Sequence, residues 1–254
     1  MAKLYFRYGV MGSSKSANAL MVRYNYEERG QQALMVKPDI DQREKTSVVN
    51  SRIGLTWPCI WFSDLMAMTP AEITAYQCVI VDEAQFLSRE EVCFLTDVVD
   101  EWNVPVICYG LRADFKGDLF PGSEALLAWA DIIEEVKTIC WCGKKATCNA
   151  RFDKSGVVLK QGEQVVLGAN DQYVGLCRRH WKEGNLGPAQ LSGHALGAEQ
   201  QSQDQPFPEA VLPVAGDGVV LEGLRPSGRV GQTDPGGVQS VDNWRHSKHL
   251  TTRS

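Results

Sequence analysis

An eight-residue loop near the start of the chain restricts the fold more than any other feature of the sequence. It reads Gly9-Val10-Met11-Gly12-Ser13-Ser14-Lys15-Ser16 and directly follows the apolar, aromatic run of residues 4–8. A strand that enters such a loop and continues into a helix is typical of phosphate binding. Small residues let backbone N–H groups surround phosphate oxygens, and the helix N-terminus adds partial positive charge. The pattern therefore predicts an α/β sheet with a phosphate-binding loop.

The last two residues of this loop suit a nucleoside triphosphate. We expect Lys15 to reach the β- and γ-phosphates and the Ser16 hydroxyl to contact Mg²⁺. The residue before the lysine, where glycine is usual in this motif, is Ser14. If that position requires a positive φ, its backbone is strained. A glycine turn before an ordinary helix is the alternative interpretation, so a second signal is needed.

That second signal follows residues 77–81, a short apolar and β-branched run that predicts a buried parallel strand. The run ends in Asp82-Glu83-Ala84-Gln85-Phe86. Adjacent residues of an extended chain point to opposite sides, so the two carboxylates can do different work. We expect Asp82 to hold Mg²⁺ opposite Ser16 and Glu83 to act as a general base. The alternative, an Asp-Glu pair that caps the next helix, is disfavoured by the loop at residues 9–16. Together the two signals indicate phosphoryl transfer.

The chain divides into three segments by composition and pattern. Residues 1–136 alternate strand and helix signals, which predicts a mainly parallel sheet with helices on both faces. Residues 137–186 combine clustered cysteines with short β-prone runs at 157–159 and 165–167, which predicts a small metal-binding domain. Residues 187–254 are rich in Gly, Pro and Gln and are expected to be disordered, because they cannot bury enough apolar surface.

Composition narrows the functional class. The 254 residues are 44% hydrophobic, which is enough for a substantial core, and the net charge of −5 argues against a general nucleic-acid binder. The sequence has neither an apolar run long enough to cross a membrane nor the features of a signal peptide, so we expect a cytoplasmic protein. Eight cysteines fit that setting better as metal ligands and buried thiols than as disulfides.

Two cysteine-containing pairs predict a zinc site. Cys140 and Cys142 are followed some 35 residues later by Cys177 and His180, a set that suits a tetrahedral zinc ion. Cys148 could replace one member of the first pair, although Gly143 favours Cys140 and Cys142 because a turn usually follows a metal-binding knuckle. Four protein ligands leave no open position, so the zinc would be structural. Buried free thiols with a surface histidine are the alternative.

The combined motifs resemble those of type II thymidine kinases, in the version found in the bacterial branch. The residues that carry the resemblance are the loop at 9–16, Asp82 to Phe86 with the preceding strand, Tyr109 to Phe115, and the two metal-binding pairs. The resemblance spans residues 1 to about 184. It implies transfer of the γ-phosphate of ATP to the 5′-hydroxyl of thymidine, and of deoxyuridine, in nucleotide salvage. It also implies a homotetramer. The negative charge and the lack of a long apolar run lead us to expect neither a nucleic-acid nor a membrane partner.

The resemblance implies the following site residues. Glu83 matches the general base. The residues that match the family's ATP and Mg²⁺ site are Gly9, Val10, Met11, Gly12, Ser13, Ser14, Lys15, Ser16, Asp82, Glu83, Ala84 and Gln85. Those that match its nucleoside site are Met11, Phe86, Leu111, Phe115, Gln164, Val165, Val166, Leu167, Gly168 and Tyr173, with the loop between the metal-binding pairs as a lasso over the nucleoside. Apart from the resemblance, Asp41 and Arg43 could complete the phosphate site, although surface charge is the narrowly favoured interpretation.

Two other functions compete with a nucleoside kinase. A nucleotide-dependent switch would use ATP or GTP only to change partner contacts, and it leaves the expected substrate lid unexplained. A zinc-ribbon nucleic-acid binder would use a local basic group around the metal: Lys144, Lys145, Arg178, Arg179 and Lys182. The overall negative charge opposes that second alternative.

Overall fold

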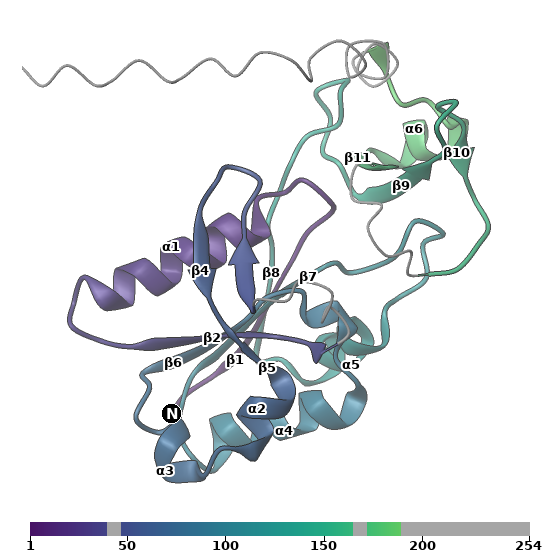
Figure 1. Ribbon diagram of the computed structural model, residues 1–254. Helices are drawn as coiled ribbons and strands as arrows, with labels where there is room; N and C mark the ends of the chain where they lie inside the picture. Colours follow the sequence, from purple (N-terminus) through teal and green to yellow (C-terminus); the bar gives the residue numbers. More distant parts are fainter. Residues whose placement is uncertain (40–46, 165–171, 189–254) are drawn as a thin grey trace, which may run out of the picture. The chain divides into compact units, whose positions relative to one another are not determined.

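The computed structural model describes residues 1–39, 47–164 and 172–188 (Figure 1). Its largest element is a six-stranded sheet with the order β5-β2-β6-β7-β1-β8, in which every neighbouring pair is parallel. The strands are β1 (Leu4–Tyr8), β2 (Ala33–Lys37), β5 (Ile60–Trp61), β6 (Cys78–Val81), β7 (Val106–Gly110) and β8 (Ile132–Glu135). Strands β6 and β7 are buried along their whole length, as expected for the centre of a parallel sheet.

Helices cover both faces of this sheet, because successive strand residues point to opposite sides. Phe6 of β1 packs with α4 and α5, whereas Tyr109 of β7 packs with α1 on the other face. The helices are α1 (Lys15–Glu27), α2 (Phe62–Ala67), α3 (Pro70–Ile73), α4 (Arg89–Asp100) and α5 (Pro121–Trp129). The predicted α/β class is therefore confirmed.

A second, smaller sheet follows the first in the sequence. It is antiparallel, with the order β10-β9-β11, and helix α6 packs against it. Its elements are β9 (Cys148–Phe152), β10 (Val158–Leu159), β11 (Tyr173–Leu176) and α6 (Arg178–Glu183). Val10 of the phosphate-binding loop belongs to the same apolar cluster as Phe152 and Leu176, so this module packs directly against the loop.

Two expectations fall partly or wholly outside the described residues. The β-prone run at 157–159 contains β10, whereas the run at 165–167 lies outside them. Of the predicted tail, only residues 187 and 188 are described. A separate hairpin of β3 (Val48–Asn50) and β4 (Thr56–Pro58), which the sequence pattern did not predict, follows β2 in the chain.

Within the described ranges, no helix combines the length and the apolar character that crossing a bilayer would require.

Candidate active site

The phosphate-binding loop has the predicted strand–loop–helix arrangement, since it connects β1 to α1. The Gly9 N–H donates to the Gly110 carbonyl at 3.1 Å, which fixes the end of β1 beside the end of β7. Ser14 precedes α1 with φ 62°, in the left-handed region that favours glycine. The expected strain is therefore present, and for a residue with a Cβ it costs about 1–2 kcal/mol.

Lys15 lies inside the loop rather than in solvent. Its side chain is buried, and Nζ donates to the Val10 carbonyl at 3.0 Å. Burial lowers the pKa of Lys15, while the charges of Glu83 and Asp82 oppose that shift. An ammonium group held beside two carboxylates and enclosed by backbone is well placed to receive a phosphate oxygen.

Asp82, at the end of β6, is in hydrogen-bond contact with the Ser16 side chain. Burial, reinforced by the charge of Glu83, raises the pKa of Asp82 to about 7, whereas the Ser16 hydroxyl and Lys15 lower it. Asp82 Oδ1 and the Ser13 hydroxyl are buried without a hydrogen-bond partner in the described part of the chain. A carboxylate oxygen and a hydroxyl are ligands that Mg²⁺ prefers, so the residues present fit a magnesium–triphosphate site.

Glu83 has a strained backbone and a side chain fixed by its neighbour. Its φ is 55°, a left-handed value that is rare for a residue with a Cβ and is concentrated at functional sites. Gln85 Nε2 donates to Glu83 Oε2 at 2.6 Å, and Gln85 Oε1 accepts the Leu111 N–H at 3.0 Å. Gln85 therefore positions the carboxylate against the end of β7, a role for Gln85 that the motif did not indicate.

The alternative role for the acidic pair, capping the next helix, is not observed. Helix α4 begins with a capping box made by other residues: the Ser88 side chain accepts the Glu91 N–H at 3.2 Å, and Glu91 accepts the Ser88 N–H at 2.7 Å. The carboxylates of Asp82 and Glu83 are therefore not used to cap α4 and remain available to the candidate active site.

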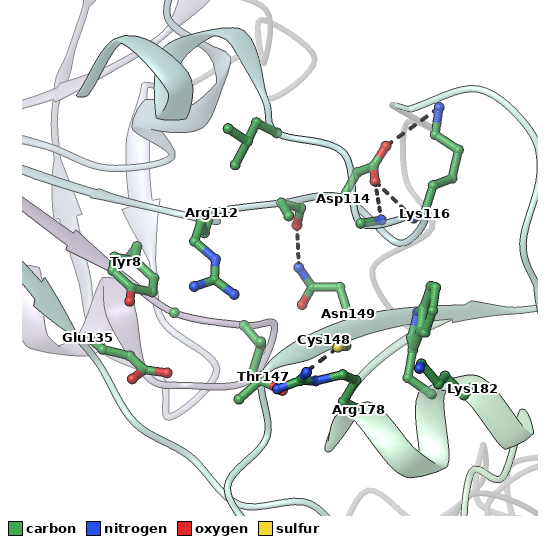
Figure 2. A pocket seen from close by; sticks show the side chains of 16 residues that line it. Tyr8, Arg112, Asp114, Lys116, Glu135, Thr147, Cys148, Asn149, Arg178 and Lys182 are labelled. Carbon is green, nitrogen blue, oxygen red and sulfur yellow. Dashed lines mark hydrogen bonds and ion pairs between the residues drawn. The ribbon is translucent and has the colours of Figure 1, made fainter. Parts of the chain in front are cut away.

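Asn149 in β9 is a site residue that sequence reasoning missed. Its side chain is buried, with Oδ1 accepting the Met11 N–H at 2.8 Å and Nδ2 donating to the Ala113 carbonyl at 2.7 Å (Figure 2). This side chain connects the small module to the phosphate-binding loop and to the segment after β7. No sequence signal marks it, because its partners are 138 and 36 residues away.

Close packing also joins β11 to the loop. A Cβ on Gly175 would lie 2.8 Å from Val10 Cγ2 and 3.1 Å from the Met11 carbonyl, so a larger residue would push the two apart. Glycine at this position lets the strand approach the loop backbone closely.

The aromatic residues predicted to bind the nucleoside separate into two environments. Phe86 is partly exposed and packs edge-on against Phe120, with ring centroids 5.7 Å apart. Phe115 is 1% exposed, and the Arg151 guanidinium lies 4.6 Å from the centre of its ring. Leu111 is also buried. Phe86 is therefore the most open of these three residues.

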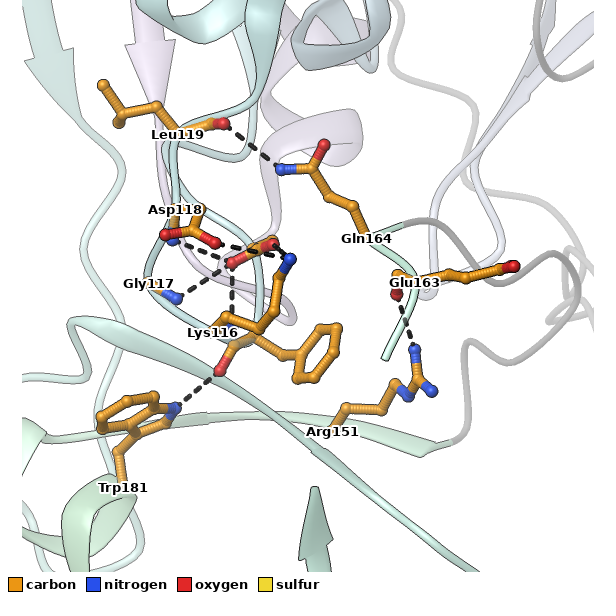
Figure 3. Close-up of polar contacts among 10 residues, drawn as sticks. Lys116, Gly117, Asp118, Leu119, Arg151, Glu163, Gln164 and Trp181 are labelled. Carbon is orange, nitrogen blue, oxygen red and sulfur yellow. Dashed lines mark hydrogen bonds and ion pairs between the residues drawn. The ribbon is translucent and has the colours of Figure 1, made fainter. Parts of the chain in front are cut away.

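Polar contacts connect the metal-binding module to the segment of residues 115–119 (Figure 3). Gln164 Nε2 donates to the Leu119 carbonyl at 3.2 Å, and Arg151 Nη1 donates to the Glu163 carbonyl at 3.0 Å. Trp181 Nε1 donates to the Phe115 carbonyl at 3.0 Å. Tyr173 lies opposite Arg151 in the β9–β11 pair.

Several further candidates lie outside the described residues: Val165, Val166, Leu167 and Gly168 of the lasso, and Asp41 and Arg43 after β2.

The four predicted metal ligands come together, and Cys148 is not among them. One ligand atom from each of Cys140, Cys142, Cys177 and His180 lies within 4.8 Å of all the others. The sulfurs of Cys142 and Cys177 are 3.9 Å apart. Tetrahedral zinc–sulfur bonds place two sulfurs about 3.8 Å apart, so the set is compatible with zinc. Backbone hydrogen bonds from His180 and Arg179 lower the pKa of the Cys177 thiol, which favours the thiolate that binds metal.

Three features define this protein as a P-loop phosphotransferase. They are the phosphate-binding loop, the acidic pair at the end of β6 and the metal-binding module packed on the loop.

The thymidine kinase family model matches residues 2–181. A thymidine kinase of Legionella pneumophila (strain Lens) is 49% identical over 193 residues, which cover 74% of this chain and 92% of that relative. Thymidine kinases of Shigella dysenteriae serotype 1 (strain Sd197) and Escherichia coli (strain K12) are 49% and 47% identical over 188 residues, covering 72% of this chain and 92% of each relative. The chain therefore belongs to the thymidine kinase family. The prediction of an ATP-dependent nucleoside kinase of nucleotide salvage is confirmed.

Proposed function

We propose that this protein transfers the γ-phosphate of ATP to the 5′-hydroxyl of thymidine, and of deoxyuridine, with the help of Mg²⁺. The observation that carries this proposal is the meeting of Lys15, Ser16, Asp82 and Glu83 where β1 and β6 end. Ligands of parallel α/β sheets bind at this edge, and the residue types are those that phosphoryl transfer requires.

Each of these residues has a separate task in the proposed reaction. The loop N–H groups and Lys15 hold the β- and γ-phosphates. Glu83 accepts the proton of the 5′-hydroxyl while the hydroxyl oxygen attacks the γ-phosphorus, and the bond from that phosphorus to the β-phosphate oxygen breaks to release ADP. Gln85 keeps the Glu83 carboxylate oriented through its 2.6 Å hydrogen bond. Ser16 and Asp82 would hold Mg²⁺, which neutralises phosphate charge when bound. Catalysis is then mainly positioning and charge stabilisation.

The metal-binding module is proposed to act as the substrate lid. Residues 137–186 would form this domain beside a kinase domain of residues 1–136, and residues 187–254 would be a separate tail. The Cys140, Cys142, Cys177 and His180 cluster would bind a structural zinc ion, because four protein ligands leave no coordination position for a substrate. A lid over the phosphates would exclude water and so limit hydrolysis of ATP. The family resemblance also supports a cytoplasmic homotetramer.

Product analysis tests the proposal directly. ADP release is measured with ATP and Mg²⁺, with thymidine, with each other nucleoside and with none. Thymidine-dependent ADP together with thymidine monophosphate is expected. ADP release that is equal with every nucleoside and without any would instead indicate the nucleotide-dependent switch.

The role of Glu83 is tested by Glu83→Gln, with the exposed Glu90 of α4 changed to Gln (Glu90→Gln) as the matched control. Glu83→Gln is expected to retain ATP binding and to lower kcat by about 10²–10⁴-fold, as loss of a general base does. Full turnover in this variant would assign the base to another residue.

A further inference from the structure

A cavity of about 350 Å³ lies beside the candidate nucleoside site without sharing its walls. It is bounded by the end of β1, the segment after β7, the end of β8, the start of β9, and α6 (Figure 2). Along the segment after β7, Arg112, Asp114 and Lys116 line it, whereas Leu111 and Phe115 do not. The cavity touches the phosphate-binding loop only at Gly9 and Val10, and Lys15, Asp82 and Glu83 are not in its lining.

The two acidic side chains of this cavity already have partners elsewhere. Glu135 forms an ion pair with Lys145. The Asp114 carboxylate accepts the backbone N–H groups of residues 116, 117 and 118 at 2.8–2.9 Å, and Lys116 Nζ lies 3.7 Å from its Oδ2. The ion pairs of these two carboxylates are thus made with Lys116 and Lys145 and not with the other cations of the lining.

Three cations of the lining have no such partner. No carboxylate within residues 1–39, 47–164 and 172–188 forms an ion pair with Arg112, Arg178 or Lys182. Figure 2 shows the Arg112 and Arg178 guanidinium groups reaching into the same space, one from the segment after β7 and one from α6. The Arg112 guanidinium is also held 5.2 Å from the centre of the Tyr8 ring, which limits where it can move.

We propose that this cavity binds a small phosphorylated molecule that carries at least two negative charges. Guanidinium groups match phosphate oxygens with paired hydrogen bonds, and two of them with a lysine suit a polyvalent anion better than a single carboxylate. The volume accommodates a ligand of roughly nucleotide size. Arg178 and Lys182, part of the basic group that the sequence suggested for nucleic acid, thereby serve a small-molecule site that is open to solvent.

Binding of inorganic pyrophosphate to the full-length, zinc-loaded protein tests this site. Calorimetry without nucleotide is expected to show two classes of site, the phosphate-binding loop and the cavity. Saturation with a non-hydrolysable ATP analogue, thymidine and excess Mg²⁺ is expected to remove the first class and leave the second. High salt is expected to weaken the remaining binding, since it rests on charge.

Two variants and a matched control locate that second site. Arg178→Gln and Arg112→Gln are each expected to weaken pyrophosphate binding in the saturated protein by about tenfold or more, as loss of a charge-assisted hydrogen bond does. Arg179→Gln removes the same charge from the same helix, but Arg179 pairs with Glu183 at 2.8 Å and does not line the cavity. This control is expected to bind pyrophosphate as the wild type does.

Three results would overturn the proposal. The first is the absence of any pyrophosphate binding once the ATP analogue is bound. The second is an equal loss in Arg179→Gln and Arg178→Gln, which would indicate a general charge effect. The third is unchanged binding in both Arg112→Gln and Arg178→Gln. Thymidine phosphorylation is measured separately, so failure of the kinase proposal and failure of this one are distinguishable.

Discussion

Asn149 is predicted to hold the small module on the phosphate-binding loop, and Asn149→Leu tests this with little change in side-chain volume. The substitution removes the partners of the Met11 N–H and the Ala113 carbonyl, which the native side chain meets at 2.8 and 2.7 Å. A buried polar group left without a partner costs about 1–3 kcal/mol, so two would cost about 2–6 kcal/mol. Because Asn149 and Ala113 border the cavity, water can reach the carbonyl, and we expect about 2–4 kcal/mol.

The assay is denaturant unfolding of the wild type and variant, combined with the KM for ATP. Because Met11 lies in the loop, the KM for ATP is expected to rise along with the loss of stability. Asn149→Asp keeps the acceptor for Met11 and loses the donor to Ala113, so it isolates one half of the bridge. Asn25→Leu on the exposed surface of α1 is the control and is expected to change stability by less than about 0.5 kcal/mol. The reasoning would be refuted if Asn149→Leu also changed the free energy of unfolding by less than about 0.5 kcal/mol and left the KM for ATP unaltered.

The remaining predictions concern three other residues or groups. Because burial raises the pKa of Asp82 to about 7, its contribution to stability is largest below about pH 4, where the unfolded carboxyl is also protonated. That contribution falls as the pH rises through 7, and Asp82→Asn should flatten the profile measured by unfolding at each pH. Chelation of zinc is expected to lower Tm and abolish thymidine phosphorylation, with both recovered on adding zinc; full activity in metal-free protein, verified by elemental analysis, would contradict a structural metal. Ser14→Gly should stabilise the fold by up to about 1 kcal/mol, because relief of left-handed strain exceeds the added unfolded-state entropy; measurable destabilisation would assign the serine a contact of its own.

The centre of the sheet was predictable because its strands are continuous apolar runs. The run at 4–8 has the bounds of β1, and the run at 77–81 differs from β6 by one residue at its start. Strand β8 was missed, since its Ile-Ile-Glu-Glu sequence has no two-residue alternation and lies at the sheet edge.

The residues of the candidate site likewise fall into two groups, those that a local sequence motif marks and those that no local motif marks. Lys15, Asp82 and Glu83 were found because each belongs to a short motif placed at the end of a strand. Gln85 and Asn149 act on backbone groups that are distant in sequence, so only the folded chain reveals their roles. The ambiguity over Cys148 also needed the fold, since spacing allowed it as a ligand while β9 places it in the lining of the cavity.

Backbone strain connects the local sequence motifs to the contacts that only the folded chain makes. Among the described residues, three residues other than glycine have a positive φ, and two of them, Ser14 and Glu83, belong to the candidate active site. Ser14 lies in the loop between β1 and α1, and Glu83 lies just after the end of β6. At both places the chain turns sharply away from a strand, and side chains and N–H groups there must face the phosphates. Such conformations persist only when surrounding contacts over-determine them. For Glu83 that contact is the Gln85 hydrogen bond at 2.6 Å, and for the loop it is the Lys15 bond to Val10 at 3.0 Å. At two of these three positions, the disagreement between local preference and structure thus falls where the proposed chemistry would occur, as expected if strain is tolerated for function.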